Sequence, residues 1–314
     1  MRRAIGLDIG GTKIAALLVT EDGEVQARHV VSTPADDAMA LISAAVGAAE
    51  AVRTSDVIAI GAGVPGMVDH RTGLLRYAPN LAARELRVGE RIAEATQLPC
   101  AVDNDANVAA WGEFLFGSGR GSNHMLMITV GTGIGGGVVA DGRLFRGSHG
   151  FAGEIGHVIV DPEGPICGCG NRGCWEQVAS GRAIERLGKE AIDLHPESLL
   201  AQLAGRDRTK VNGTLVTEAA RRGDDLARSL LVSVGRRLGQ GLAGLVNILD
   251  PDVVVVGGGV VLAADMLLGP ARVAFRESVE AFSHRTEVPI LSAQLGNDAG
   301  AIGAAAMALE ECGP

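Results

Sequence analysis

The chain has 314 residues, of which 45 are glycine and only two are Trp and one Tyr, and 47% are hydrophobic. This length corresponds to about two domains, and the composition excludes both collagen and a disordered chain. The net charge of −9 argues against a general binder of nucleic acids or membrane surfaces. No apolar run reaches the ~18 residues that span a bilayer, and an acidic residue and three glycines by residue 11 leave no room for a signal peptide, so we expect a cytoplasmic protein.

The N-terminal third of the chain predicts strands joined by tight turns. Residues 4–19 are apolar on both sides of Gly10-Gly11, and a turn at Asp22-Gly23 precedes a strand over 25–31. Apolar residues at helical spacing follow over 38–52. Further on, the pattern predicts strands over 57–60 and 99–102 and a helix over 107–116.

A second strand, glycine turn and strand begin at residue 125 and repeat the pattern of the N-terminus, which indicates two similar lobes. Residues 226–249 predict a long amphipathic helix, and a buried strand over 253–256 runs into Gly257-Gly258-Gly259. Residues 195–213 are polar and predict an irregular surface segment. The small residues of 300–310 predict a helix that packs tightly.

Two stretches, 61–66 and 131–136, match the pattern G-x-G-x-x-G. Neither opens a helix, so a dinucleotide site is disfavoured, and the P-loop pattern is absent from the sequence. Glycine-rich hairpin turns let backbone N–H groups approach an anion. Lys13 adds a cation beside the first turn, and Asp8 could hold a hydrated Mg²⁺, so these turns indicate phosphate binding.

Polar residues crowd the start of the helix that follows residue 102, in the order Asp103, Asn104, Asp105 and Asn107. An N-cap accounts for one of them, not for four. Asn and Asp together supply the donors and acceptors that a sugar requires. A carboxylate here could also accept the proton of an attacking hydroxyl, and we favour Asp105 for this role.

One histidine and three cysteines, His157, Cys167, Cys169 and Cys174, match a Cys₃His zinc site. Four protein ligands close the coordination shell, so the zinc would be structural. Glu154 and Glu176 bracket the cluster, and zinc would hold both carboxylates near one point. His157 could ligate zinc through one ring nitrogen and contact a sugar hydroxyl through the other.

These motifs together resemble the sugar kinase/actin ATPase superfamily and, within it, the bacterial glucokinases of the ROK family. The resemblance covers nearly the whole chain and rests on Asp8–Lys13, Gly63–Gly66, Asn104-Asp105, Gly131–Gly133, the Glu154–His157 and Cys167–Cys174 signature and Gly257–Gly259. It implies a two-lobed α/β fold of the actin-like, ribonuclease H-like ATPase type with a zinc-binding loop. Residues 1–109 plus 299–314 would form a small lobe, and 110–298 a large lobe carrying that loop.

The resemblance also implies ATP-dependent phosphorylation of glucose at its 6-hydroxyl, with Mg²⁺ accompanying ATP and Asp105 as the catalytic base. The implied sugar-binding residues are Gly66, Asn80, Asn104, Asp105, Glu154, His157 and Glu176. The implied nucleotide-binding residues are Asp8, Gly10, Gly11, Thr12, Lys13, Gly131, Thr132, Gly133, Gly257, Gly258 and Gly259. Relatives suggest a homo-oligomer, either a dimer or a tetramer.

Several alternatives remain open from the sequence. The acceptor could be N-acetylmannosamine, mannose or fructose, and the donor could be polyphosphate. The family also contains sugar-binding repressors, but these carry an N-terminal helix-turn-helix domain, whereas here the first strand begins at Ala4. A sugar sensor without catalysis is disfavoured because Asp105 is present.

Overall fold

A computed structural model describes residues 1–259 and 264–313, and its first sheet has the strand order β3-β2-β1-β4-β8. The strands of this sheet are β1 (Arg3–Ile9), β2 (Lys13–Thr20), β3 (Val25–Ser32), β4 (Val57–Val64) and β8 (Cys100–Asn104). β1, β4 and β8 are parallel, whereas β1, β2 and β3 are joined by antiparallel hairpins. The three parallel strands therefore bring their carboxyl ends to one edge.

The second sheet repeats this arrangement with the order β11-β10-β9-β12-β13. Its strands are β9 (Met125–Val130), β10 (Ile134–Ala140), β11 (Arg143–Leu144), β12 (Val253–Gly257) and β13 (Ile290–Ser292). Again a hairpin, β9 and β10, adjoins parallel strands, β12 and β13. A smaller antiparallel sheet flanks the first one and contains β5 (Met67–Asp69), β6 (Leu74–Tyr77) and β7 (Arg84–Arg87).

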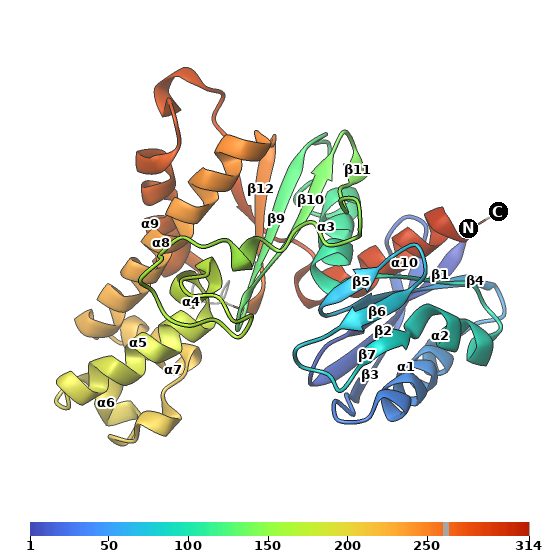
Figure 1. Cartoon of the computed structure of the whole chain (residues 1–314), viewed down its shortest axis with the longest axis horizontal. Coiled ribbons are helices and arrows are strands. Elements are labelled where there is room, and N and C mark those ends of the chain that lie inside the picture. Colours follow the sequence, from blue (N-terminus) through green and yellow to red (C-terminus); the bar gives the residue numbers. More distant parts are fainter. Residues whose placement is uncertain (260–263, 314) are drawn as a thin grey trace.

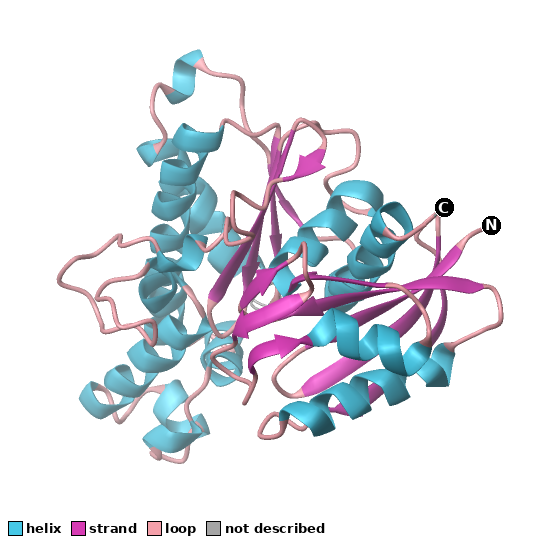
Figure 2. Cartoon of the chain, turned by 45° about the vertical axis from the view of Figure 1, so that its right-hand side comes forward, coloured by secondary structure: helices cyan, strands magenta, loops and turns pink. Residues whose placement is uncertain are grey.

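Helices cover the two large sheets (Figures 1 and 2). The first sheet packs on α1 and α2, and the second on the bundle around α8, since the buried residues of these helices share a core with the strands. The helices are α1 (Ala38–Val52), α2 (Val88–Thr96), α3 (Asp105–Phe116), α4 (Trp175–Ala179), α5 (Gly181–Leu194), α6 (Leu199–Leu203), α7 (Gly213–Arg221), α8 (Asp225–Leu249), α9 (Ala264–Ser278) and α10 (Ala299–Glu311). Short 3₁₀ turns are η1 (Ile155–His157), η2 (Arg208–Lys210), η4 (Phe282–His284) and η5 (Gly296–Asp298).

The C-terminal helix α10 lies against the first sheet and α3 at backbone contact distance. A Cβ on Gly6 of β1 would lie 1.7 Å from the Ala301 carbonyl oxygen, and one on Gly303 would lie 1.7 Å from the Val108 oxygen. Only glycine permits these approaches. Part of the glycine excess therefore allows α10 to pack closely against both the sheet and α3.

The structure confirms the predicted α/β fold with two similar sheets, the hairpins around Gly10-Gly11 and 131–133, and the long and C-terminal helices. The prediction for 195–213 was wrong in part, because α6 forms there and buries Leu200 and Ala201, and Val211 farther along the segment is buried too. Among the described residues, no helix is both long enough and apolar enough to cross a membrane. Residue 314, within the predicted small lobe, lies outside the described residues.

Candidate functional site

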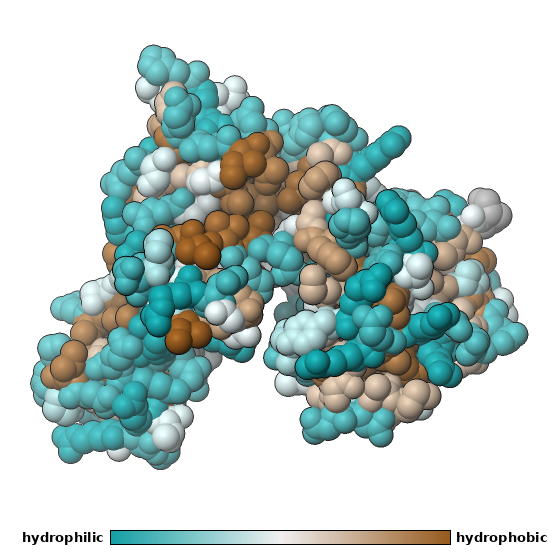
Figure 3. All heavy atoms as spheres, in the orientation of Figure 1, coloured by the Kyte–Doolittle hydropathy of each residue, from teal (hydrophilic) through white to brown (hydrophobic). Residues whose placement is uncertain are grey.

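The carboxyl ends of the parallel strands place the first group of predicted site residues at one edge of the first sheet. Asp8 pairs in register with Gly63, and Gly63 with Asp103, so β1, β4 and β8 end at the same level. Ligands of open α/β sheets bind outside this edge. Asn104 and Asp105 follow at the β8–α3 junction, and Figure 3 shows the molecule hollowed between its two halves.

The turn between β1 and β2 is closed by a hydrogen bond from the Gly10 N–H to the Lys13 oxygen, 2.9 Å long. Thr33 braces it, since its hydroxyl donates to the Gly10 oxygen and its N–H to the Thr12 oxygen. Thr12 and Lys13 are exposed. Asn80 is also exposed, and its Cβ lies 3.4 Å from the position of a Cβ on Gly11. The predicted phosphate turn is thus held open to solvent with Asn80 beside it.

Asp105 is the first residue of α3 and is partly buried. Asn104 caps the helix by accepting hydrogen bonds from the Ala106 and Asn107 N–H groups. The Asn104 amide also donates to the Gly66 oxygen at 3.1 Å. Gly66 has a φ of +100°, and a Cβ there would lie 2.2 Å from the Tyr77 oxygen, so this close turn requires glycine.

Carboxylates crowd around Asp105, and its charge raises the pKa of two of them, Asp8 and Glu154. Burial raises the pKa of Asp105 itself, although hydrogen bonds from Ala106 and Asn104 oppose the shift. Burial, followed by the charge of Asp105, raises the pKa of Asp8 to about 6, against the lowering effect of Lys13. Burial also raises the pKa of Glu154, with Asp105 and Glu176 adding to the shift and His157 opposing it. The clustering of perturbed carboxylates is typical of a functional site.

The four predicted zinc ligands converge, with their ligand atoms all within 4.8 Å of one another. The Cys169 and Cys174 sulfurs are 3.6 Å apart, and the Cys167 sulfur is 3.6 Å from His157 Nδ1. A tetrahedral zinc would place two sulfurs about 3.8 Å apart, and a sulfur and a nitrogen about 3.6 Å apart. Burial raises the pKa of the Cys174 thiol to about 12, so a cation would be needed to hold it as a thiolate. The cluster fits zinc in both geometry and donor set.

The same loop presents two carboxylates. Glu176, in the first turn of α4, accepts a hydrogen bond from the Cys167 thiol at 3.1 Å. Glu154 precedes η1, and its carboxylate lies 3.9 Å from His157 Nε2. His157 therefore faces the cysteines with Nδ1 and Glu154 with Nε2; the contact of its second nitrogen with a sugar hydroxyl stays a prediction.

The second glycine turn adjoins a cavity of about 510 Å³ in the other half of the molecule. The Gly131 oxygen accepts from the Gly181 N–H at 2.8 Å, which joins the turn to the start of α5. Gly258 has a φ of +93°, and a Cβ there would lie 2.5 Å from the Val130 oxygen. Residues from the turns, α5 and α7 line the cavity: Gly131, Thr132, Gly181, Arg182, Ile184, Glu185, Gly213, Thr214, Thr217, Glu218, Arg221 and Gly259.

The predicted nucleotide residues are thus divided between the two sheets. Gly131, Thr132 and Gly259 line the 510 Å³ cavity, Gly133 and Gly257–Gly258 adjoin it in sequence, and Asp8 and Gly10–Lys13 belong to the first sheet. Sequence reasoning missed the contribution of α5 and α7, such as Arg182 and Thr214. Their sequences carry no binding motif, and only the packing of the helices brings them to the cavity.

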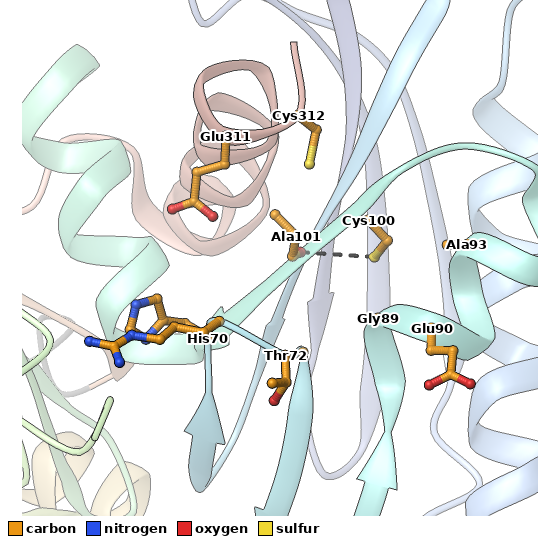
Figure 4. Close-up of a pocket in the computed structure, with 11 residues that line it drawn as sticks. His70, Thr72, Gly89, Glu90, Ala93, Cys100, Ala101, Glu311 and Cys312 are labelled. Atoms are coloured by element: carbon orange, nitrogen blue, oxygen red, sulfur yellow. Dashed lines mark hydrogen bonds between the residues drawn. The ribbon is translucent and has the colours of Figure 1, made fainter. Parts of the chain in front are cut away.

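A second cavity, of about 340 Å³, lies beside the end of α10 and contains none of the predicted site residues. Figure 4 shows Glu311 and Cys312 above it and Cys100, Thr72 and Glu90 around it. Glu311 is already paired with Arg146. Glu90 is likewise paired with Arg87. Both glutamates that line this cavity are therefore already paired within the protein.

Comparison with known proteins identifies the group to which this chain belongs. The ROK family profile matches residues 4–311. A glucokinase of Streptomyces coelicolor is 40% identical over 99% of this chain and 98% of its own length, and an N-acetylmannosamine kinase of Escherichia coli is 35% identical over 98% of each chain. The crystal structure of a ROK family glucokinase from Streptomyces griseus in complex with glucose and AMPPNP matches with a TM-score of 0.88 at 40% identity, covering 98% of this chain and 99% of its own. The chain therefore belongs to the ROK family.

Proposed function

We propose that this protein is a glucokinase, which transfers the γ-phosphoryl group of ATP to the 6-hydroxyl of glucose. The observation that carries the proposal is the position of Asp105. Its carboxylate is partly buried at the carboxyl edge of the first sheet, with Asn104 beside it. Asp8 and Glu154 lie close enough for the charge of Asp105 to raise their pKa. The glucokinases of Streptomyces coelicolor and Streptomyces griseus, each 40% identical to this chain, support glucose as the acceptor.

The sugar would be held by the polar groups that surround Asp105. Asn104 can donate and accept, while the Glu154 and Glu176 carboxylates can each accept from a sugar hydroxyl. His157 would use Nε2, the ring nitrogen that faces Glu154 rather than the cysteines. Gly66 would line the pocket through its backbone, and Asn80 would lie at its edge.

A nucleotide donor is supported by the 510 Å³ cavity. A cavity of this size suits an adenosine, which a polyphosphate chain lacks. Gly257, Gly258 and Gly259 would approach the nucleoside. The two hairpin turns, with Gly10–Lys13 on one side and Gly131–Gly133 on the other, would hold the phosphates through backbone N–H groups, the Thr12 and Thr132 hydroxyls and the Lys13 ammonium.

The residues present fit two metal ions with different roles. Zinc at His157, Cys167, Cys169 and Cys174 would be structural, because four protein ligands leave no position for water. Asp8 would hold Mg²⁺, since its carboxylate is crowded by Asp105 and Asp298 and oxygen is the donor that this ion prefers. Mg²⁺ bound with ATP would neutralise charge on the phosphates.

The protein's own part in the reaction is positioning and proton transfer. The sugar ligands would align the 6-hydroxyl with the γ-phosphorus, and Asp105 would accept its proton. The raised pKa of Asp105 brings the carboxylate nearer to the operating pH and makes it a better base. Closure of the two halves would exclude water, which would otherwise compete as acceptor.

We assign residues 1–109 and 299–314 to a small lobe and 110–298 to a large lobe. The packing of α10 against the first sheet supports this division.

A homo-oligomer, dimer or tetramer, is supported by apolar side chains exposed on the zinc loop, including Ile159 and Ile166. Light scattering of the purified protein tests this. The need for three reduced cysteines supports the cytoplasm as the place of action, and phosphorylation of glucose would place the enzyme in glycolysis.

The test is a coupled assay with a panel of sugars and phosphoryl donors. We expect the highest kcat/KM with glucose and ATP. A higher kcat/KM with N-acetylmannosamine would move the assignment to that branch of the family, and efficient use of polyphosphate would contradict the role of the 510 Å³ cavity. No phosphorylation of any hexose would overturn the assignment as a kinase.

A further inference from the structure

Arg146 joins the two halves of the molecule beside the proposed sugar site. It lies in the segment between β11 and η1, which leads from the second sheet to Glu154. Its Nε donates to Asp103 Oδ2 at 2.5 Å, and its Nη2 donates to Glu311 Oε1 at 2.8 Å. Asp103 belongs to the first sheet and Glu311 ends α10. One guanidinium therefore ties three separate segments together.

The Asp103 carboxylate is entirely buried, and one of its oxygens accepts hydrogen bonds from residues of the proposed site. Oδ1 accepts from the Asn104 N–H at 2.7 Å and from the Asn107 amide at 2.9 Å, while Oδ2 accepts from Arg146. A buried carboxylate needs a paired charge. Without Arg146, the buried Asp103 carboxylate would lose its ion-pair partner. It would then no longer be held in the position from which it accepts a hydrogen bond from the Asn104 N–H.

The hydrogen bonds continue from Asp103 to the proposed base. Asp103 fixes the backbone of Asn104, whose side chain holds the first turn of α3 and the Gly66 oxygen. Asp105 is the next residue and shares the Ala106 N–H with Asn104. A displacement of Asp103 would therefore move a proposed sugar ligand and the proposed base together.

The segment that carries Arg146 is seated on the first half of the molecule at a second point. Gly150 has a φ of +85°, and a Cβ there would lie 2.6 Å from the Val68 oxygen of β5. Farther along the segment, Gly153 reaches the Asn107 side chain, with 3.7 Å between a Cβ there and Asn107 Oδ1. Glu154 follows directly. Arg146 and Glu154 thus belong to one segment that is fixed to the first half of the molecule, and the contacts of this segment set the position of Glu154 relative to Asn104 and Asp105.

We propose that Arg146 is a positioning residue for phosphoryl transfer. It acts through Asp103 and holds Asn104 and Asp105 at the distance and orientation to Glu154 that one bound sugar requires. This inference rests on the proposed function and adds a residue to it. Arg146 does not contact the nucleotide cavity, whose lining comes from other segments. Its loss should therefore affect the sugar and leave the nucleotide site unchanged.

The test is Arg146→Gln, which removes the charge and keeps much of the length of the side chain. We expect KM and Kd for glucose to rise about tenfold and kcat to fall about tenfold, because small displacements of reacting groups cost this much or more. KM for ATP should stay as in the unmodified protein. A residue that served stability alone would lower the amount of folded enzyme and leave both KM values unchanged.

Two matched variants separate the roles of the charges. Arg143→Gln removes an exposed arginine three residues away and should change none of these constants. Glu311→Gln removes the charge of the second acid that pairs with Arg146. The Glu311 side chain is 37% exposed, so this change should have a much smaller effect than Arg146→Gln. If Arg146→Gln does not fold, Arg146→Lys is the variant to measure. Lysine retains the charge at Asp103 but lacks the planar guanidinium that reaches both Asp103 and Glu311. We therefore expect a rise in the KM for glucose that is smaller than the tenfold rise expected for Arg146→Gln.

Unchanged glucose Kd and kcat in folded Arg146→Gln, or in folded Arg146→Lys if the first variant does not fold, would overturn the positioning role. An equal rise of the KM values for glucose and ATP would overturn it too. Failure of the proposed function is distinguishable, because it appears in the unmodified protein as absence of glucose phosphorylation. If the panel identifies another hexose, the same ratios are measured with that hexose.

Discussion

Removing one zinc ligand should weaken sugar binding without touching a proposed sugar ligand. Cys169→Ser changes the ligand that is most exposed of the three cysteines and lies 3.6 Å from the Cys174 sulfur. The loss of zinc would release the loop that runs from His157 to Cys174. Cys174 is the N-cap residue of α4 and Glu176 lies in the first turn of this helix, so the Glu176 carboxylate should lose its fixed position.

The size of the effect follows from the contact that is lost. A hydrogen bond to a charged group contributes about 1.5–3 kcal/mol, which corresponds to about 10- to 150-fold in affinity. We therefore expect Kd for glucose to rise by about 10-fold or more if only the Glu176 contact is lost, and further if Glu154 moves as well. The thermal unfolding midpoint should fall in the same variant, because binding of a structural metal contributes to folding free energy.

The assay combines metal analysis, glucose titration and thermal unfolding on one preparation of each protein. We expect one zinc per chain in the unmodified protein and a reduced content in Cys169→Ser. Cys312→Ser is the control, since Cys312 lies at the end of α10 beside the 340 Å³ cavity and outside the cluster. Absence of zinc from the unmodified protein would refute the assignment, and normal glucose affinity in a zinc-free variant would refute the link to Glu176.

Two further predictions concern the other groups of the site. The value of kcat/KM should fall as the pH drops toward and below about 6, because Asp8 gains a proton there. Protonation of Asp105, whose pKa is also raised, removes the base and adds to the loss at lower pH. A pH–rate profile that stays flat to pH 5 would contradict this. Gly258→Ala should raise KM for ATP and spare Kd for glucose, because a side chain at a φ of +93° is strained by about 1–3 kcal/mol and meets the Val130 oxygen. Gly244→Ala, which places its methyl group in open space on α8, is the control, and equal nucleotide titrations for the two variants would exclude the role of Gly258.

The parts of the site that could be predicted from the sequence are those whose determinants are local. The glycines of the two hairpins and the spacing of Cys167, Cys169 and Cys174 specify turns and a metal cluster within a few residues. Asn104 was predicted among the polar residues that could cap a helix, and it does cap α3. In each case, residues that are neighbours in the sequence remain neighbours in space.

What the sequence did not reveal depends on contacts between distant segments. Arg146 and Asp103 are 43 residues apart, and neither pattern nor spacing connects them. Long-range packing also determines how α8 meets α9. The two helices approach closely at Gly235 and Gly239, where a Cβ would lie 2.4 Å from the Leu267 oxygen and 2.0 Å from the Ala271 oxygen, respectively. A hydrophobic period identifies the apolar residues of a helix, whereas close backbone contact is made by glycines, which that period does not count.

The most direct test of the proposed kinase mechanism is the turnover of Asp105→Asn at saturating glucose and ATP, measured together with its Kd for glucose. Asparagine has the size of aspartate and its oxygen can still accept from the Ala106 N–H, as Asp105 Oδ1 does at 2.9 Å, but it cannot take a proton from the 6-hydroxyl. We predict that kcat falls by about 10²- to 10⁴-fold, the usual contribution of a general base, while glucose still binds. Turnover close to that of the unmodified protein would contradict the assignment of Asp105 as the base.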